Sequence, residues 1–99
     1  MKRIQISKKA FQDLEDGFHF YELQKSGLAD YFSASLQADI ERQKNSAGIH
    51  SIAYRDYNHV VSNVFPFGIF YTDESYIVIV WTIVDMRRDP EWIREHLSR

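Results

Sequence analysis

The 99-residue sequence contains no cysteine and only two prolines and four glycines. It therefore has no disulfide, no thiol nucleophile and no thiolate metal site, and packing alone must stabilise it. Seven Phe, six Tyr and two Trp residues can supply that packing. A chain of this length has room for one compact domain, which we expect to span residues 1–99.

Long apolar runs and a basic excess are also missing. The longest apolar run, residues 76–84, contains Thr82 and is far shorter than the roughly 20 residues that span a bilayer. Charges interrupt the first 20 positions, so we expect a cytoplasmic protein without a secretory signal and without a membrane span. The 12 Lys and Arg are outnumbered by 14 Asp and Glu. Proteins that depend on phosphate contacts usually carry a basic excess, and here only Arg87-Arg88 forms a basic feature.

Motifs for cofactor or metal chemistry are absent from the sequence. The glycines are scattered and form no phosphate-binding loop, and no GxSxG motif occurs. The four histidines lack the spacing of metal ligands. Asp85 and Asp89 are a candidate pair for a divalent ion, but Arg87 and Arg88 between them favour a salt-bridged cluster. We therefore expect neither a cofactor nor a metal.

The first half of the chain predicts one strand and two helices. Residues 2–6 alternate between apolar and polar side chains, as in a half-buried strand. Ser7 offers an N-cap to a first helix, which ends at Lys25-Ser26-Gly27, and a second helix follows over residues 28–44. So short a break requires an antiparallel helical hairpin. The expected apolar stripes are Phe11, Leu14, Phe18 and Tyr21 in the first helix and Leu28, Tyr31, Phe32, Leu36 and Ile40 in the second.

Beyond Gly48 the pattern changes to short segments rich in β-branched and aromatic residues. Pro66 cannot occupy a central ladder position and marks a break between two strands. Short connections between consecutive strands favour an antiparallel meander. The expected segments are a connecting loop at residues 49–56, strands at 58–65, 67–71 and 76–84, and a hairpin turn at 72–75.

A short final helix over residues 90–97 should close the chain. Asp89-Pro90-Glu91 is a strong helix start, with a capping carboxylate, proline at the first position and an acid in the first turn. Trp92, Ile93 and Leu97 are its expected anchors. The order β-α-α-β-β-β-α predicts an α+β fold, in which the helical hairpin packs on a small, mainly antiparallel four-stranded sheet.

The second half also resembles a known protein family. It contains Tyr54-Arg55, FPFGIFY at residues 65–71, IVIV at residues 77–80 and RRDPEW at residues 87–92. Together with the helical hairpin, these strings resemble the RelE/ParE superfamily of toxins from bacterial type II toxin-antitoxin modules, in particular its plasmid-stabilisation subgroup. The resemblance covers nearly the whole chain.

The resemblance implies two possible activities. RelE-like toxins cut messenger RNA on the ribosome, whereas ParE-like toxins bind DNA gyrase and inhibit it. It also implies a cognate antitoxin that neutralises the toxin in a hetero-oligomer. RNA cleavage needs a base, an acid and stabilisation of the phosphate charge. For a nuclease, the candidate catalytic residues are Arg55, Arg87 and Arg88, with either His59 or Tyr71.

Two departures from the family pattern favour binding over cleavage. Many relatives carry a histidine before the arginine pair, whereas this chain has Asp85, which is a poor general acid at its ordinary pKa. Relatives often carry arginines in the strand before Phe65, whereas this chain has Asn58, His59, Asn63 and Val64. The leading hypothesis is therefore a ParE-like gyrase inhibitor. A RelE-like endonuclease and an inactive toxin-fold binding protein remain alternatives.

Several of these residues also have a purely structural interpretation. Phe65, Phe67, Phe70 and Tyr71 flank a turn in a small sheet and are expected to be mainly core residues. Arg87 and Arg88 either form salt bridges to Asp85 or Asp89 or, together with Trp92, form a site for a partner.

Overall fold

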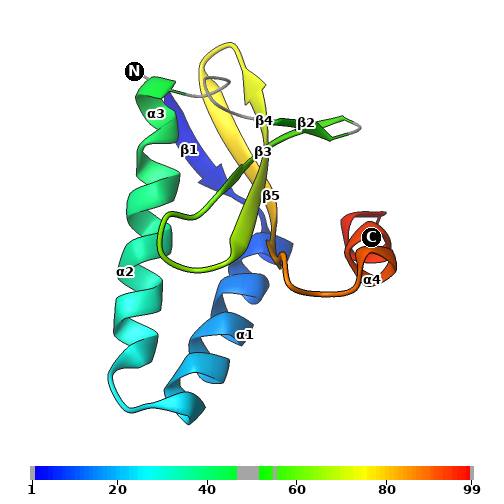
Figure 1. The fold of residues 1–99 in the computed structure, drawn as a ribbon. Coiled ribbons are helices and arrows are strands. Elements are labelled where there is room, and N and C mark those ends of the chain that lie inside the picture. The colour runs from blue at the N-terminus through cyan, green and yellow to red at the C-terminus, as the bar shows by residue number, and fades with distance from the viewer. Residues whose placement is uncertain (1, 47–51, 55, 99) are drawn as a thin grey trace.

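The computed structural model describes residues 2–46, 52–54 and 56–98 (Figure 1). Five strands form one sheet in the order β1-β5-β4-β3-β2, with β1 parallel to β5 and the other neighbours antiparallel. The elements are β1 (Arg3–Ile6), α1 (Lys8–Gln24), α2 (Leu28–Glu41), α3 (Gln43–Ser46), β2 (Ile52–Tyr54), β3 (Tyr57–Val61), β4 (Phe67–Glu74), β5 (Ile77–Asp85) and α4 (Pro90–Ser98).

The two faces of the sheet pack against different helices. The α1–α2 hairpin packs on one face and forms the larger core, while α4 follows β5 at the end of the chain and lies to the side of the hairpin (Figure 1). The smaller core joins α4 to the sheet through Phe70, Val84, Ile93 and Leu97. Tyr71, next to Phe70 in β4, belongs to the larger core, because successive strand residues point to opposite faces.

The predicted fold class is confirmed, with one additional strand. Residues 52–54 form the edge strand β2, where the sequence predicted a loop, so the sheet has five strands instead of four. Strand β2 pairs with β3 through backbone groups, and such pairing does not require alternating side chains. The sequence of residues 49–56 has no strand periodicity, so it gave no sign of this strand. The predicted second helix is also divided, with α2 ending at Glu41 and α3 following.

The buried face of α1 differs from the predicted stripe. Phe11 is 58% exposed, whereas the neighbouring Ala10 is fully buried. The face that packs on the sheet consists of Ala10, Leu14, Gly17 and Tyr21. The predicted stripe was based on large apolar residues and omitted Ala10 and Gly17, because alanine and glycine contribute little to such a pattern.

The predicted hairpin connection is confirmed in detail. The Ser7 hydroxyl accepts the Ala10 N–H at 3.0 Å, which caps the start of α1. Gly27 has φ of 89°, the left-handed conformation that glycine adopts without strain. The Glu22 carboxylate then accepts the backbone N–H groups of Gly27 at 3.2 Å and Ala29 at 3.4 Å. A side chain of α1 thus satisfies donors at the start of α2.

The aromatic residues around Pro66 are core residues, as predicted. Phe65 and Phe67 pack edge-on against Phe32 of α2, with ring centroids 5.2 and 5.1 Å apart. Phe70 and Tyr71 are at most 1% exposed. Across the described ranges, no helix is both long enough and apolar enough to cross a membrane.

Candidate functional site

The two arginines that follow β5 make different contacts. Arg87 donates from Nε to Asp85 Oδ1 at 3.1 Å and from Nη2 to Asp85 Oδ2 at 2.9 Å. Its backbone N–H also donates to Asp85 Oδ1, and Nη2 reaches the Tyr21 hydroxyl at 3.5 Å. The salt bridge to Asp85, one of the two structural interpretations, is therefore confirmed for Arg87.

The same contacts set the ionisation of this group. Burial acts to raise the pKa of Asp85, but the hydrogen bonds and positive charge of Arg87 outweigh it and hold the pKa below 3.8. The hydrogen bond to Asp85 raises the pKa of Arg87, and burial raises the pKa of Tyr21 above 10.0. Asp85 is thus ionised near neutral pH and does not serve as a general acid there.

Replacement of Asp85 by asparagine should lower the free energy of unfolding at pH 7 by less than about 1 kcal/mol, because Arg87 is largely exposed and solvent screens the pair. The pKa of Asp85 is lower in the folded state than in the unfolded state. Its contribution is therefore present above the unfolded value near 3.8 and is lost as the pH falls through the folded value. Urea unfolding of both proteins between pH 2 and 7 tests this, and a difference that persists at pH 2 would contradict it.

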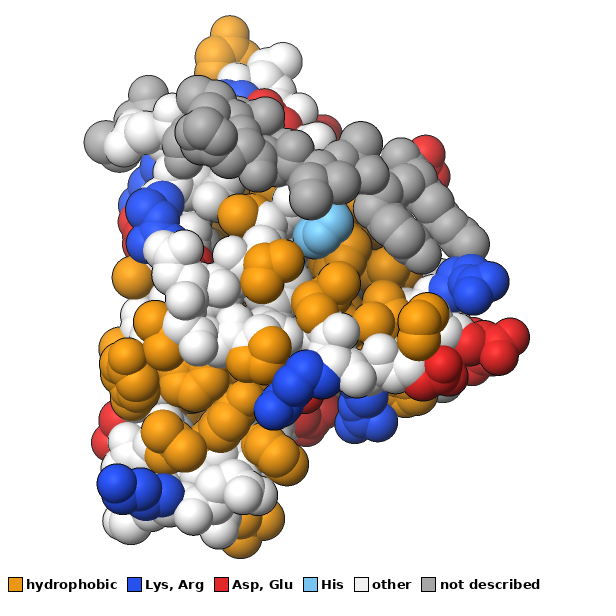
Figure 2. All heavy atoms as spheres, viewed as in Figure 1, with side chains coloured by type: hydrophobic (Ala, Val, Ile, Leu, Met, Phe, Trp, Pro, Cys, Tyr) orange, Lys and Arg blue, Asp and Glu red, His pale blue; other side chains and the backbone are white. Residues whose placement is uncertain are grey.

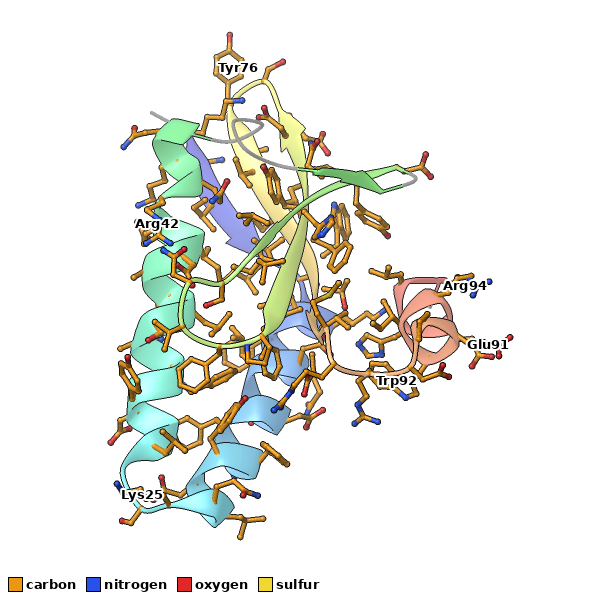
Figure 3. All side chains as sticks on the ribbon, viewed as in Figure 1. Lys25, Arg42, Tyr76, Glu91, Trp92 and Arg94 are labelled. Atoms are coloured by element: carbon orange, nitrogen blue, oxygen red, sulfur yellow. The ribbon has the colours of Figure 1, made fainter. Side chains whose placement is uncertain are left out.

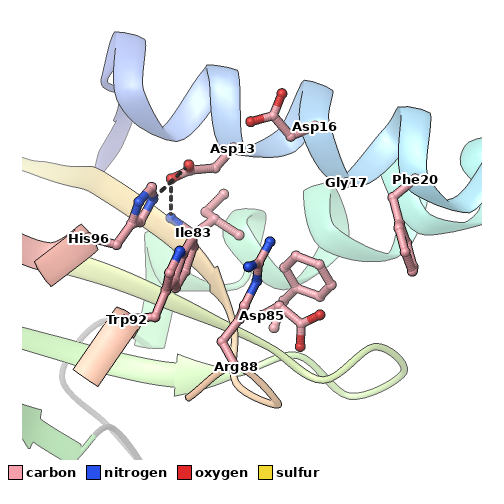
Figure 4. Close-up of a pocket in the computed structure, with 10 residues that line it drawn as sticks. Asp13, Asp16, Gly17, Phe20, Ile83, Asp85, Arg88, Trp92 and His96 are labelled. Carbon is pink, nitrogen blue, oxygen red and sulfur yellow. Dashed lines mark hydrogen bonds and ion pairs between the residues drawn. The ribbon is translucent and has the colours of Figure 1, made fainter. Parts of the chain in front are cut away.

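Arg88 is held by an aromatic ring instead of a carboxylate. Its guanidinium carbon lies 4.2 Å from the centroid of the Trp92 ring. The His96 ring is stacked on Trp92 with centroids 4.7 Å apart, and Trp92 lies between His96 and Arg88 in Figure 4. Within residues 2–46, 52–54 and 56–98, the Arg88 side chain makes no hydrogen bond and no ion pair. Its donors are therefore open to a ligand.

Asp13 joins α1, β5 and α4 next to this stack. Its side chain is 9% exposed. Oδ2 accepts the Thr82 hydroxyl at 2.8 Å and the Ile83 N–H at 2.9 Å, and Oδ1 lies 2.9 Å from His96 Nε2 (Figure 4). The His96 carbonyl in turn accepts a hydrogen bond from the Lys9 side chain. These contacts fix the position of α4 against the rest of the fold.

A cavity of about 330 Å³ lies between α1, the end of β5 and the start of α4. We call it the α1–α4 pocket. Charged and apolar side chains both line it (Figure 4). Its lining residues are Asp13, Asp16, Gly17 and Phe20 from α1, Phe67, Ile83 and Asp85 from the sheet, and Arg88, Trp92 and His96 near and within α4. Within the part of the chain that the structure describes, no group of three His, Asp or Glu side chains has an arrangement that would hold a metal ion.

The structure brings together the predicted partner-binding residues and places the two alternative catalytic residues, His59 and Tyr71, on opposite faces of the sheet. Arg87, Arg88 and Trp92 lie together around the start of α4. His59 is 9% exposed and stacked on Phe70 at 4.8 Å, on the face of the sheet that carries α4. Tyr71 is fully buried in the larger core on the opposite face. Arg55 lies outside the described residues.

Sequence reasoning missed Asp13 and His96. The two residues are 83 positions apart, one in the middle of the first helix and one in the last helix. No local spacing connects them, so only the topology shows that they meet.

Comparison with known proteins shows what the fold resembles. No protein-family model matches the chain, and a search of curated proteins finds no similar sequence. Among solved structures, a chain of the chromosomal ParDE toxin-antitoxin system from P. aeruginosa matches with a TM-score of 0.75. The match covers 84% of this chain and 94% of that chain, at 13% sequence identity. The protein described here therefore shares its fold with that chain of a ParDE toxin-antitoxin system.

Proposed function

We propose that this protein is the toxin of a bacterial type II toxin-antitoxin module, that it inhibits DNA gyrase by binding, and that a cognate antitoxin neutralises it in the cytoplasm. The observation that carries the proposal is the structural match to a chain of a ParDE system over 84% of this chain. Fold alone does not determine activity, so the choice between binding and cleavage depends on the side chains.

The arrangement of the candidate catalytic groups supports binding. Cleavage of RNA needs a base, an acid and positive charge within reach of one phosphate. His59 and Tyr71 lie on opposite faces of the sheet, and Tyr71 is fully buried. Arg87 is engaged by Asp85, which is ionised near neutral pH. Tyr71 is therefore out of reach of a phosphate at the surface, and the pairing with Asp85 makes Arg87 less available to stabilise a phosphate charge.

The surface of the protein supports a protein partner. Hydrophobic side chains gather over the helical hairpin and the loop between β3 and β4 (Figure 2). Tyr31 of this surface contacts the Phe65 ring at 5.4 Å. Contiguous exposed apolar surface commonly marks a protein interaction site, and an antitoxin is the partner expected here. The exposed hydrophobic residues of these elements include Phe20, Leu23, Tyr31, Val61 and Val64, which are 47 to 87% exposed.

The proposal is tested by tightly controlled expression in a bacterial host that carries a reporter of DNA-damage signalling. We expect induction to arrest growth and to activate the reporter, because a poisoned gyrase leaves DNA breaks. Primer extension on cellular messages in the same cultures detects cleavage. Co-expression of the product of an adjacent short reading frame should restore growth.

Each other outcome of this experiment identifies an alternative. Growth arrest with site-specific message cleavage that disappears in Arg87→Ala would favour the ribosome-dependent endonuclease. Normal growth at a high level of soluble, folded protein would favour an inactive binding protein. Either result would overturn gyrase inhibition as the function.

A further inference from the structure

The α1–α4 pocket is lined by an open cation, Arg88 after the end of β5, and an open anion, Asp16 on α1. Asp85 is paired with Arg87, and Asp13 accepts hydrogen bonds from three groups. In contrast, Arg88 carries donors with no acceptor among the described residues. The exposed Asp16 accepts only from Gln12, through Oδ1 at 2.9 Å, and its Oδ2 is open in the same part of the chain. A complementary ligand must therefore offer both an acceptor for Arg88 and a donor for Asp16.

The ring of Trp92 orients the Arg88 guanidinium for hydrogen bonds to a planar acceptor. Stacking at 4.2 Å fixes the plane of the guanidinium and leaves its N–H edges free. A fixed guanidinium loses less entropy on binding, and its forked donors match the two oxygens of a carboxylate. Trp92 is directed toward the body of the protein, whereas Glu91 and Arg94 on the same helix point away from it (Figure 3).

The charges of the pocket disfavour phosphate and nucleic acid. Three carboxylates line it, from Asp13, Asp16 and Asp85, against the single arginine Arg88. Because Asp85 is paired with Arg87 and Asp13 accepts from three groups, Arg88 and Asp16 are the charges that a ligand would meet. A phosphate group with up to two negative charges exceeds the single positive charge of Arg88. A carboxylate carries one charge and needs only the one open cation. Of the anions that proteins commonly bind, the lining therefore favours the carboxylate.

The remaining lining points to a carboxylate that is part of a peptide. Phe20 is 48% exposed, and with the buried Ile83 it offers an apolar surface to methylene groups. Asp16 can accept a backbone N–H beside the acidic side chain. A volume of about 330 Å³ accommodates a side chain with its adjoining backbone, at the lower end of the usual range for ligand pockets.

From these contacts we infer that the α1–α4 pocket binds a glutamate or aspartate side chain of a peptide segment, with Arg88 holding the carboxylate and Asp16 the neighbouring backbone N–H. The identity of the segment as part of a toxin-binding protein rests on the proposed function. Recognition of the carboxylate rests on the pocket alone. Arg88 is thus a contact residue, and Trp92 positions it.

The test is an NMR titration of the ¹⁵N-labelled full chain with acetyl-leucyl-glutamate amide, compared with acetyl-leucyl-glutamine amide at the same ionic strength. The Arg88 Nε–H and Trp92 Nε1–H signals should shift in a saturable way with the acidic probe. The affinity for the neutral probe should be lower by a factor of about ten or more, because this probe lacks the charge-assisted hydrogen bonds. Trp81 Nε1–H, which donates to Thr72 at 2.8 Å, is the internal reference and should not shift.

Two variants locate the binding. Arg88→Gln should abolish the saturable shift of Trp92, whereas Arg94→Gln, which changes an exposed arginine on the outer side of α4, should leave it unchanged. Unchanged dispersion of the backbone signals confirms that both variants are folded. Equal binding of the two probes, persistence of the shift in Arg88→Gln, or a larger response to inorganic phosphate would overturn the inference.

The two proposals fail separately. The titration uses purified protein and a small probe, so its outcome is independent of toxicity. A toxic protein that ignores the acidic probe would overturn only the pocket assignment. Binding of the probe by a protein that leaves growth unaffected would overturn only the proposed function.

Discussion

Replacement of Asp13 by alanine is expected to lower the free energy of unfolding by about 3 to 5 kcal/mol, because it leaves several buried groups without a partner. The Asp13 carboxylate is 9% exposed and accepts hydrogen bonds from Thr82 and Ile83 of β5. It also holds His96 of α4 at 2.9 Å. Strand β1 ends at Ile6, which pairs with Val80, so the Ile83 N–H lies beyond the pairing of β1 and depends on Asp13.

Urea unfolding at pH 7 measures this loss, and Asp16→Ala is the matched control. Asp16 lies on the same helix but is exposed and accepts one hydrogen bond, from its neighbour Gln12. We expect Asp16→Ala to change the free energy of unfolding by less than about 0.5 kcal/mol. Equal losses in the two variants would show that Asp13 does not join the three elements as described.

Replacement of Gly17 by alanine should destabilise the protein by about 2 kcal/mol, although the same change usually stabilises a helix by about 1 kcal/mol. A Cβ at this position would lie 2.5 Å from Phe32 Cζ and 2.8 Å from a second carbon of the same ring. Phe32 is fully buried and packs against Tyr21, Phe65 and Phe67, so the ring has little room to move. The close approach of α1 and α2 therefore requires glycine.

A double-mutant cycle with Phe32→Leu tests this cause. Leucine removes the ring carbons that the new methyl group would meet, so the double variant should lose less stability than the sum of the two single losses. Thermal and urea unfolding of all four proteins give the coupling. Additive losses, or stabilisation by Gly17→Ala alone, would contradict the proposed contact.

Much of the fold could be predicted because local signals agree with the tertiary structure. Ser7, Gly27 and Pro90 mark helix ends that the structure confirms within one residue of the prediction. The prediction was wrong where backbone pairing determines a strand or where small residues form the buried face of a helix. Strand β2 pairs with β3 although its sequence has no strand periodicity, and the buried face of α1 uses Ala10 and Gly17 in place of Phe11.

The candidate site was predictable only in part. Arg87, Arg88 and Trp92 are close in sequence, and a short turn into a helix keeps them together. Sequence could not show that Arg87 is engaged by Asp85 while Arg88 is open, because that division depends on which side chain reaches the Trp92 ring. Nor could it place Asp13 and His96 in one pocket, since the topology alone brings α1 and α4 together.

The proposed function requires that the protein bind DNA gyrase and leave RNA uncut. The most direct measurement is a supercoiling assay with purified gyrase and relaxed plasmid, run beside a reconstituted translation reaction on a defined message. The account predicts that the purified protein inhibits supercoiling in a concentration-dependent manner and leaves the message intact on the ribosome. Full supercoiling activity together with a cleaved message would contradict it.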